Sequence, residues 1–484
     1  MHRLLQILLL LPLLLWLPVC AEAQDQVELL QARSAEGGVI NGEPVRKLIG
    51  EVRLASEQVT IEADSAWQYQ NRNRIDAFNI QITTDQETIW ADTLHYNTIT
   101  EFSQFRGRVI LHSGEHRLYS ETVDVDRISN LTFFHSPVRF EDERGVLVAQ
   151  TGSYNQARER GTFQGQVQLS DSTQYFEADT LRMDRLADQY ELHGSVYAID
   201  LEEEVTLTGT YLEADSTGRR LLEGDAWMMQ LRQEGQDSTY LFADRILLLE
   251  QDTIQTLEAT GQVRIWNPEW SAIADSLHYR SDRELFRLWS DPILWQERLQ
   301  LTGPEIEAEF RNEQIHTLTA WPQPVAVMEV ESIGRFHQVS GDSLVARFSD
   351  GEISQMDVIR QNDLIYQQQD EQGEPDGLIE LTADGTLRLH FDAGELSRFR
   401  ATENIDGSWH PESPSLSEQR LDRFQWNPER RPNQPGIQTP RFPPIPDELP
   451  FQPGERYRNA LARDPDLSLD RPTNPNPEPS VRED

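Results

Sequence analysis

A short phrase of sequence recurs along this chain at a spacing of roughly 29 residues, and repetition at such a period predicts a structure built from stacked units. The phrase reads EADTLRM at 177–183 and IADSLHY at 273–279. Its acidic residue falls at Asp64, Asp92, Asp179, Asp244 and Asp275. A second phrase, Gly-x-Val-x-Leu, keeps the same period and begins at Gly50, Gly107, Gly165, Gly194 and Gly261. Roughly eleven copies therefore cover residues 27–400.

Both phrases have the pattern of a β-strand. In VQL at 167–169 and LRM at 181–183, apolar and polar residues alternate, which predicts one buried and one solvated face. Gln168 and Arg182 are expected on the solvated face. We find no long stretch with the 3.6-residue period of a helix, so the fold class is all-β.

A unit of two short strands cannot bury its apolar face alone, whereas stacked copies share one continuous interior. The glycine of the second phrase predicts a turn or bulge at a corner. The aspartate of the first phrase is expected at the rim of the interior, where it accepts hydrogen bonds from backbone N–H groups of the turn or of the next copy, because a lone buried carboxylate is costly. A ligand-binding role for this aspartate is the alternative.

The composition excludes some classes of protein. The 484 residues carry a formal charge of -39, and 37% are hydrophobic. This acidic excess argues against nucleic acid as a partner, because phosphate binding needs a clustered basic surface. No later stretch is apolar enough to span a bilayer as a helix.

The first residues have the pattern of a secretory signal. Arg3 precedes an apolar run from Leu4 to Val19, and Ala21-Glu22-Ala23 offers a small-x-small cleavage site. Residues 1–23 are therefore expected to be a signal peptide. A lipoprotein with Cys20 as the lipidated residue is the alternative, which Val19 fits poorly.

Strand, A-D-x-L-x-Y, polar turn and G-x-V-x-L after a signal peptide resemble the LptA/OstA-like family. The closest copies are ADTLHYNTITEFSQFRGRVIL (91–111) and ADSLHYRSDRELFRLWSDPILW (274–295). The resemblance covers residues 27–400, and its strength lies in the repetition of a short motif. The family comprises periplasmic lipopolysaccharide transport proteins and the N-terminal domain of LptD.

The resemblance implies an open β-jellyroll whose hydrophobic groove carries the acyl chains of lipopolysaccharide between the inner and outer membranes. It also implies partners: lipopolysaccharide, LptC-like and LptD-like bridge components that dock by strand edges, and possible head-to-tail self-association. The implied location is the periplasm, with a possible association with the outer membrane. The chain departs from the family in being about twice as long as one family domain and in lacking the transmembrane barrel of LptD.

The extra length predicts either two modules in tandem or one longer jellyroll. We assign residues 24–230 to the first module and 231–408 to the second, with a seam near 230–240. The candidate groove residues are Val109, Leu111, Val167, Leu169, Leu181, Met183, Val196, Ile246, Leu248, Val263, Ile265 and Leu277. For each of them, an ordinary position in the packed core of a closed sandwich is the alternative.

No enzyme activity and no cofactor or metal are expected. His112-Ser113-Gly114-Glu115-His116 spells H-x-x-E-H, but it reads as strand, turn and strand rather than the helix that a zinc protease needs. The chain has no P-loop and no G-x-S-x-G. An exported scaffold or adhesin remains an alternative, as does a β-helix polysaccharide-degrading enzyme, although such an enzyme concentrates its carboxylates on a few rungs.

Residues 409–484, here called the tail, differ from the rest of the chain. Most of the prolines fall in this segment, so it is expected to form no sheet and to be disordered or polyproline-like. Trp426, Phe442 and Phe451 could dock onto a groove or a partner.

Overall fold

The computed structural model describes residues 28–55, 59–85, 87–114, 116–142, 145–202, 204–230, 238–251, 254–311, 314–349, 351–370, 372–392 and 395–464. The expected signal peptide, with Cys20, and most of the seam near 230–240 lie outside the described residues. The chain divides into two compact units: Met1–Ser216 with Gln438–Glu483, and Thr217–Ile437 with Asp484. This division falls before the boundary expected at residue 230, and the tail contributes to both units.

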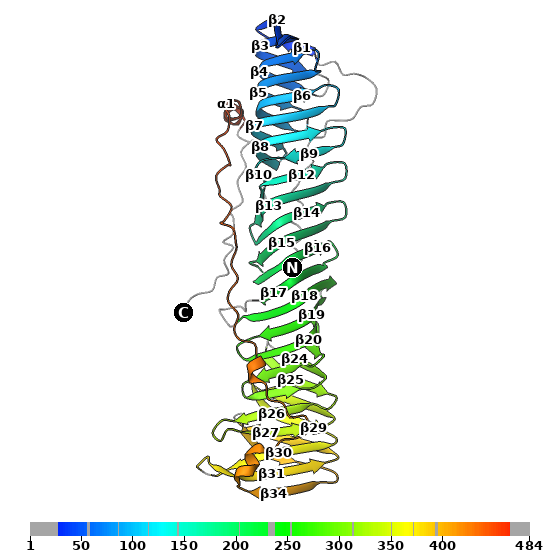
Figure 1. The fold of residues 1–484 in the computed structure, drawn as a ribbon, viewed down its shortest axis with the longest axis vertical. Coiled ribbons are helices and arrows are strands. Elements are labelled where there is room, and N and C mark those ends of the chain that lie inside the picture. Colours follow the sequence, from blue (N-terminus) through cyan, green and yellow to red (C-terminus); the bar gives the residue numbers. More distant parts are fainter. Residues whose placement is uncertain are drawn as a thin grey trace. The chain divides into compact units, whose positions relative to one another are not determined.

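Among its described residues, unit 1 contains sixteen antiparallel strands, most of which form hairpins that follow one another along the chain (Figure 1). They are β1 (Glu28–Gln31), β2 (Ser34–Ile40), β3 (Glu43–Ala55), β4 (Thr60–Tyr69), β5 (Arg74–Thr83), β6 (Thr88–Asn97), β7 (Phe102–Ser113), β8 (His116–Asp126), β9 (Leu131–Phe134), β10 (Val138–Glu141), β11 (Gly145–Ala149), β12 (Thr151–Asn155), β13 (Arg160–Asp171), β14 (Gln174–Asp184), β15 (Gln189–Asp200) and β16 (Val205–Asp215).

Unit 2 continues the same kind of antiparallel strands. They are β17 (Arg220–Gln230), β18 (Thr239–Gln251), β19 (Ile254–Trp266), β20 (Trp270–Arg280), β21 (Leu285–Trp289), β22 (Ile293–Gln296), β23 (Leu299–Thr302), β24 (Glu305–Arg311), β25 (Gln314–Trp321), β26 (Val325–Val330), β27 (Arg335–Ser340), β28 (Ser343–Ser349), β29 (Glu352–Ile359), β30 (Asn362–Gln369), β31 (Pro375–Ala383), β32 (Thr386–Asp392), β33 (Glu395–Arg400) and β34 (Asp406–Pro411).

A β-bulge interrupts the pairing of most long strands and divides them into two segments. In β13 the register against β14 shifts between Gln164 and Val167, at Gly165, whose φ is 76°. The same shift occurs at Gly50, Gly107, Gly194 and Gly261, with φ between 70° and 95°. Only glycine adopts this left-handed backbone without strain, which explains why the phrase begins with it.

In part of unit 2, the two segments of a long strand are separate strands instead of being joined by a bulge. Strand β20 pairs with β21 through one segment and with β22 through the other. From there the chain alternates between two ladders, β21–β24–β25–β28–β29–β32–β33 and β22–β23–β26–β27–β30–β31–β34. The two segments of a rung thus become separate strands.

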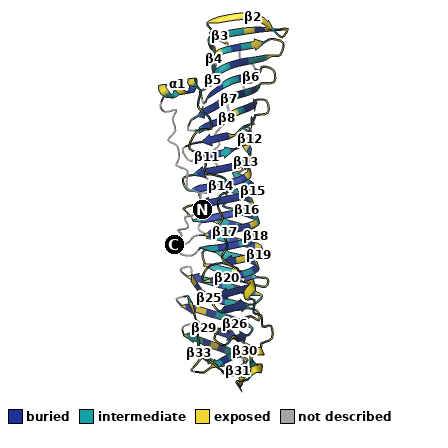
Figure 2. Ribbon diagram, turned by 60° about the vertical axis from the view of Figure 1, so that its left-hand side comes forward, coloured by how far each residue is buried: buried dark blue, intermediate teal, exposed yellow. Residues whose placement is uncertain are grey.

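The buried residues form two layers. One face of the strands, here called the inner face, carries the apolar ladders, for example Val167 opposite Ala178 and Leu169 opposite Phe176. Along the strands of both units, buried stretches dominate, whereas β2 is exposed (Figure 2). The opposite face is here called the outer face; the tail covers part of it, for example at Arg139, Gln168 and Gln338.

The tail forms no strand after β34 in its described part, as the sequence predicts. It contains the short 3-10 helices η4 (Pro414–Glu418) and η5 (Pro428–Arg430) and one helix, α1 (Glu455–Arg463). The expectation of a disordered or polyproline-like segment needs refinement, because residues 412–461 hydrogen-bond and pack against the outer face. In unit 1, α1 lies beside β6–β8 (Figure 1). Residues 465–484 lie outside the described residues.

Candidate functional site

The inner face brings together all the groove residues expected from the sequence. In unit 1 they lie on β7, β13, β14 and β15, and in unit 2 on β18, β19 and β20. Each is at most 9% exposed, and Leu181 is fully buried. They continue into one another across strand pairs, as when Leu111 faces Leu118 and Leu277 faces Ala259. Within each unit, these side chains form one apolar lining.

The two segments of a rung meet across this lining. Phe163 on β13 packs edge-on against Phe140 on β10, with ring centroids 5.6 Å apart. Phe134 contacts both rings, at 6.3 and 5.4 Å. A Cβ added to Gly152 would lie only 2.6 Å from the Phe163 ring, so the ring fills the space that this glycine leaves. The interior here is close-packed.

The interior of unit 2 contains a small cavity of about 30 Å³, lined mostly by apolar residues such as Leu299, Met328, Leu364 and Leu389, and also by His337 and Gln338. A cavity of that size has room for only about two water molecules. An acyl chain would therefore enter this interior only if its side chains moved apart.

The repeated aspartates lie at the bulges, not in the interior. The side chain of Asp179 is about half exposed, and its Oδ2 accepts the Ser195 N–H at 3.1 Å. A Cβ on Gly194 would lie 2.2 Å from the same oxygen, so the carboxylate occupies the space beside this glycine. The guanidinium of Arg441 hydrogen-bonds Asp179 and holds its pKa below the ordinary value.

The other repeated aspartates vary this arrangement. Asp92 pairs with Arg108, and Asp244 lies within 2.2 Å of a Cβ built on Gly261. Asp64 accepts a hydrogen bond from the Asn79 side chain at 2.8 Å. The side chain of Asp275 hydrogen-bonds its neighbour Ser276. No group of three or more histidine, cysteine or acidic residues that could hold a metal occurs within the described ranges.

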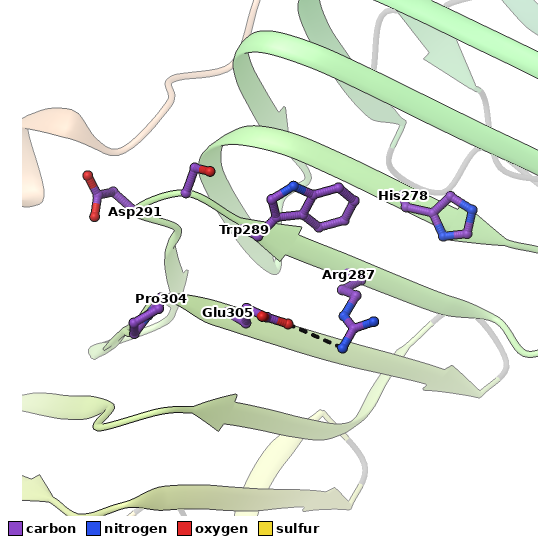
Figure 3. Close-up of a pocket in the computed structure, with 7 residues that line it drawn as sticks. His278, Arg287, Trp289, Asp291, Pro304 and Glu305 are labelled. Carbon is purple, nitrogen blue, oxygen red and sulfur yellow. Dashed lines mark ion pairs between the residues drawn. The ribbon is translucent and has the colours of Figure 1, made fainter.

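A surface pocket of about 610 Å³ lies in unit 2, apart from the apolar lining (Figure 3). His278, Arg287 and Trp289 come from β20 and β21, and Glu305 from β24. Arg287 pairs with Glu305 at 3.2 Å and with Glu307 at 3.3 Å. A guanidinium already paired with two carboxylates is a poor site for a phosphate, so this pocket does not extend the lipid site.

The sequence pattern missed the buried residues of the outer face. Gln168, expected on the solvated face, is only 7% exposed because the tail lies over it. Trp90, Ile110 and Tyr119 are buried there against helix α1. The consecutive apolar residues VIL at 109–111 are the signal that both faces of this segment are buried. Arg182 is exposed as expected.

The described part of the chain, residues 28–464 with short gaps, contains no helix long and apolar enough to cross a membrane.

The fold defines an all-β protein of stacked antiparallel rungs with an apolar inner face, as the sequence predicts. Residues 24–179, about a third of the chain, match the family described as OstA-like protein. Over these residues, the match confirms the predicted resemblance to the OstA/LptA-like family, whose domain fits a β-jellyroll, and it supports a role in lipopolysaccharide transport at the level of the family. Proteins of this family are periplasmic transport proteins rather than enzymes. No curated protein matches the chain.

Proposed function

We propose that this chain is an exported transport protein that binds lipopolysaccharide and carries its acyl chains along the apolar inner face between the inner and outer membranes. The observation that supports the proposal is the apolar lining, which recurs on every long rung of both units and begins inside the segment that matches the OstA-like family. The groove residues from Val109 to Leu277 are the ones that contact lipid.

The energetics of lipid transfer favour such a lining. Each acyl CH₂ that leaves water contributes about 0.8 kcal/mol. The cargo displaces contacts between side chains such as Phe163 and Phe140 and replaces them with contacts to the acyl chain. The two segments of a rung, joined only through the bulge, separate to admit it.

Site-specific photo-crosslinking in the native host tests this proposal. A photoreactive amino acid replaces Val167 or Leu181 on the inner face, and the exposed Gln164 or Arg182 serves as the matched control on the same strands. We expect lipopolysaccharide adducts at the inner pair only. Crosslinks confined to the protein, with abundant lipid and normal expression, would instead support the alternative of an exported β-repeat scaffold with a permanently packed interior.

The partners that we propose are LptC-like and LptD-like bridge components, which add a strand to an exposed edge, and a second copy that associates head to tail. In unit 1, β1 and β2 are exposed throughout most of their length, with Leu30 57% and Val39 70% exposed. In unit 2, β34 exposes Trp409 at 58%. Strands with unpaired backbone groups are templates for such addition. We also propose that the mature protein resides in the periplasm.

A further inference from the structure

Polar residues on the outer face of unit 1 are buried although the sequence alternation places them in water. Gln168 and Glu177 are 7% and 1% exposed, and Arg139 is 5% exposed. A buried polar group destabilises the fold unless it has a hydrogen-bond partner. The partners of all three come from the backbone of the tail, more than 260 residues later in the sequence.

These side chains match the hydrogen-bonding capacity of the tail residues that they contact. The carboxylate of Glu177 accepts the N–H of Arg441 at 2.8 Å and that of Phe442 at 2.9 Å. Proline has no N–H and offers only its carbonyl. At Pro443 the side chain of Gln168 donates to that carbonyl at 2.7 Å.

Further along the tail, a proline carbonyl again accepts a hydrogen bond from a side chain of the strands. Neighbouring residues of the strands hold these side chains in position. Arg139 donates to the Pro446 carbonyl at 2.7 Å, and Glu141 holds the guanidinium at 2.9 Å. Gln168 Nε2 also donates to the hydroxyl of Tyr175 at 2.6 Å. That hydroxyl donates to Glu177 at 2.6 Å, and burial raises the pKa of Tyr175. The cluster is therefore a prearranged set of donors and acceptors for an extended, proline-containing chain.

An apolar anchor ends the contact. Tyr457 of α1 is 4% exposed and packs among Trp90, Ile110 and Tyr119. Its ring lies edge-on to Trp90 at 5.0 Å, and its hydroxyl lies 3.0 Å from Nε2 of His112. Deeply buried aromatic anchors of this kind dominate the affinity of peptide interfaces.

Unit 2 uses the same device independently. Gln338 donates to the carbonyl of Gln419 at 3.0 Å and accepts the N–H of Leu421 at 2.9 Å. Gln300 does the same for the Gln425 carbonyl and the Asn427 N–H, both at 2.8 Å. Two glutamines at 1% and 0% exposure thus recognise the carbonyl of one residue and the N–H of the residue two further on.

We propose that the outer face of unit 1 is a binding groove for an extended, proline-rich peptide, and that its ligand is residues 441–461 of the same chain. The contacts are noncovalent and are made by side chains that the strands already position. None of them requires the peptide to be joined to the same chain. The groove lies on the face opposite the apolar lining, so the proposal does not rest on lipid binding.

The test uses the full chain with a protease site inserted after Gly436, where an added Cβ would meet open space and the next residue, Ile437, is exposed. After cleavage, we expect the fragment that begins at Ile437 to co-elute with the rest of the protein. A labelled synthetic peptide of residues 438–464 is expected to bind the cleaved protein in place of this fragment, and to bind the uncut protein far more weakly because the groove is occupied.

Variants of the peptide leave the folding of the groove untouched. Tyr457→Ala is expected to weaken binding by roughly tenfold or more, because it removes the buried anchor. Arg458→Ala, an exposed neighbour in the same helix, serves as the control and is expected to bind as the unmodified peptide does. Release of the fragment without peptide binding, or equal binding of the two variants, would overturn the proposal.

Discussion

Replacing Gly107 with alanine tests the geometry of the bulge. The φ of Gly107 is 70°, and a Cβ at this position would lie 2.5 Å from Oδ2 of Asp92 and 3.0 Å from its Cβ. Gly114, just beyond the same strand, has a φ of 59° and open space around an added Cβ. Both glycines therefore have a left-handed backbone, but only at Gly107 would an added Cβ clash with a neighbouring side chain.

The expected losses of stability follow from these distances. Left-handed backbone destabilises alanine by about 1–2 kcal/mol at either position. At Gly107 the clash also forces Asp92 away from Arg108, whose Nη2 lies 2.6 Å from Oδ1. This pair is partly exposed and worth at most about 1 kcal/mol, and the local overpacking adds about 1 kcal/mol or more. We expect a total of about 2–4 kcal/mol for Gly107→Ala and about 1–2 kcal/mol for Gly114→Ala.

Native-state hydrogen exchange of the amides in β6–β8 measures the effect, since repeat structures lose stability locally. The double variant Gly107→Ala/Asp92→Ala removes the atoms that clash most closely, so its loss is expected to fall toward that of Gly114→Ala. Equal losses for the two single variants, or a double variant that is worse than the sum of its parts, would refute the steric reasoning.

Three further predictions concern the two buried layers. Phe163→Ala removes a fully buried ring between two others and is expected to lower the free energy of unfolding of its unit by about 3–5 kcal/mol, measured by urea denaturation; a loss below about 1 kcal/mol would mean that the interior is not packed. Burial, together with the nearby Arg117, lowers the pKa of His112 to about 3, so the folded state keeps it neutral while the unfolded state binds a proton below about pH 6.5. The contribution of His112 to the free energy of unfolding is therefore complete above that pH, and toward pH 3 it is lost by up to about 1.4 kcal/mol per pH unit. His112→Gln is expected to reduce this dependence on pH, measured by urea denaturation at pH 7, 6 and 5. Gln300→Ala leaves two backbone groups of the tail without these partners, and faster hydrogen exchange at Asn427 is expected, with unchanged exchange as the contrary result.

The repeat predicts the strands and their inner face because both follow from local patterns. EADTLRM at 177–183 lies within β14, and Leu181 and Met183 point to the interior as the alternation requires. The position of Asp179 depends on more than its own strand. Asp179 lies two residues before Leu181, so a regular strand would place both on the same face. Asp179 is nevertheless exposed, because the bulge at Gly194 on the neighbouring strand shifts the register between Glu177 and Thr180. A shift of pairing changes which face a side chain occupies.

The contacts of the tail could not be predicted in the same way, because they join segments that share no period. A strand face covered by another sheet becomes apolar, and such runs are recognised in a sequence. A face covered by an extended proline-rich chain must instead supply partners for backbone carbonyls and N–H groups, so it keeps glutamine, glutamate and arginine. Gln168 therefore has the sequence signature of a solvated residue and the burial of a core residue.

This difference also explains how a chain with only 37% hydrophobic residues buries so much of each rung. The inner face is apolar, whereas the outer face combines polar residues with apolar ones such as Tyr119 and Phe336, which pack against aromatic residues of the tail. Polar side chains stabilise the second layer through hydrogen bonds to a backbone that presents few donors. The side-chain amides of the strands thus bind the backbone carbonyls of the proline-containing tail. Substitutions on either side are expected to weaken the same contact.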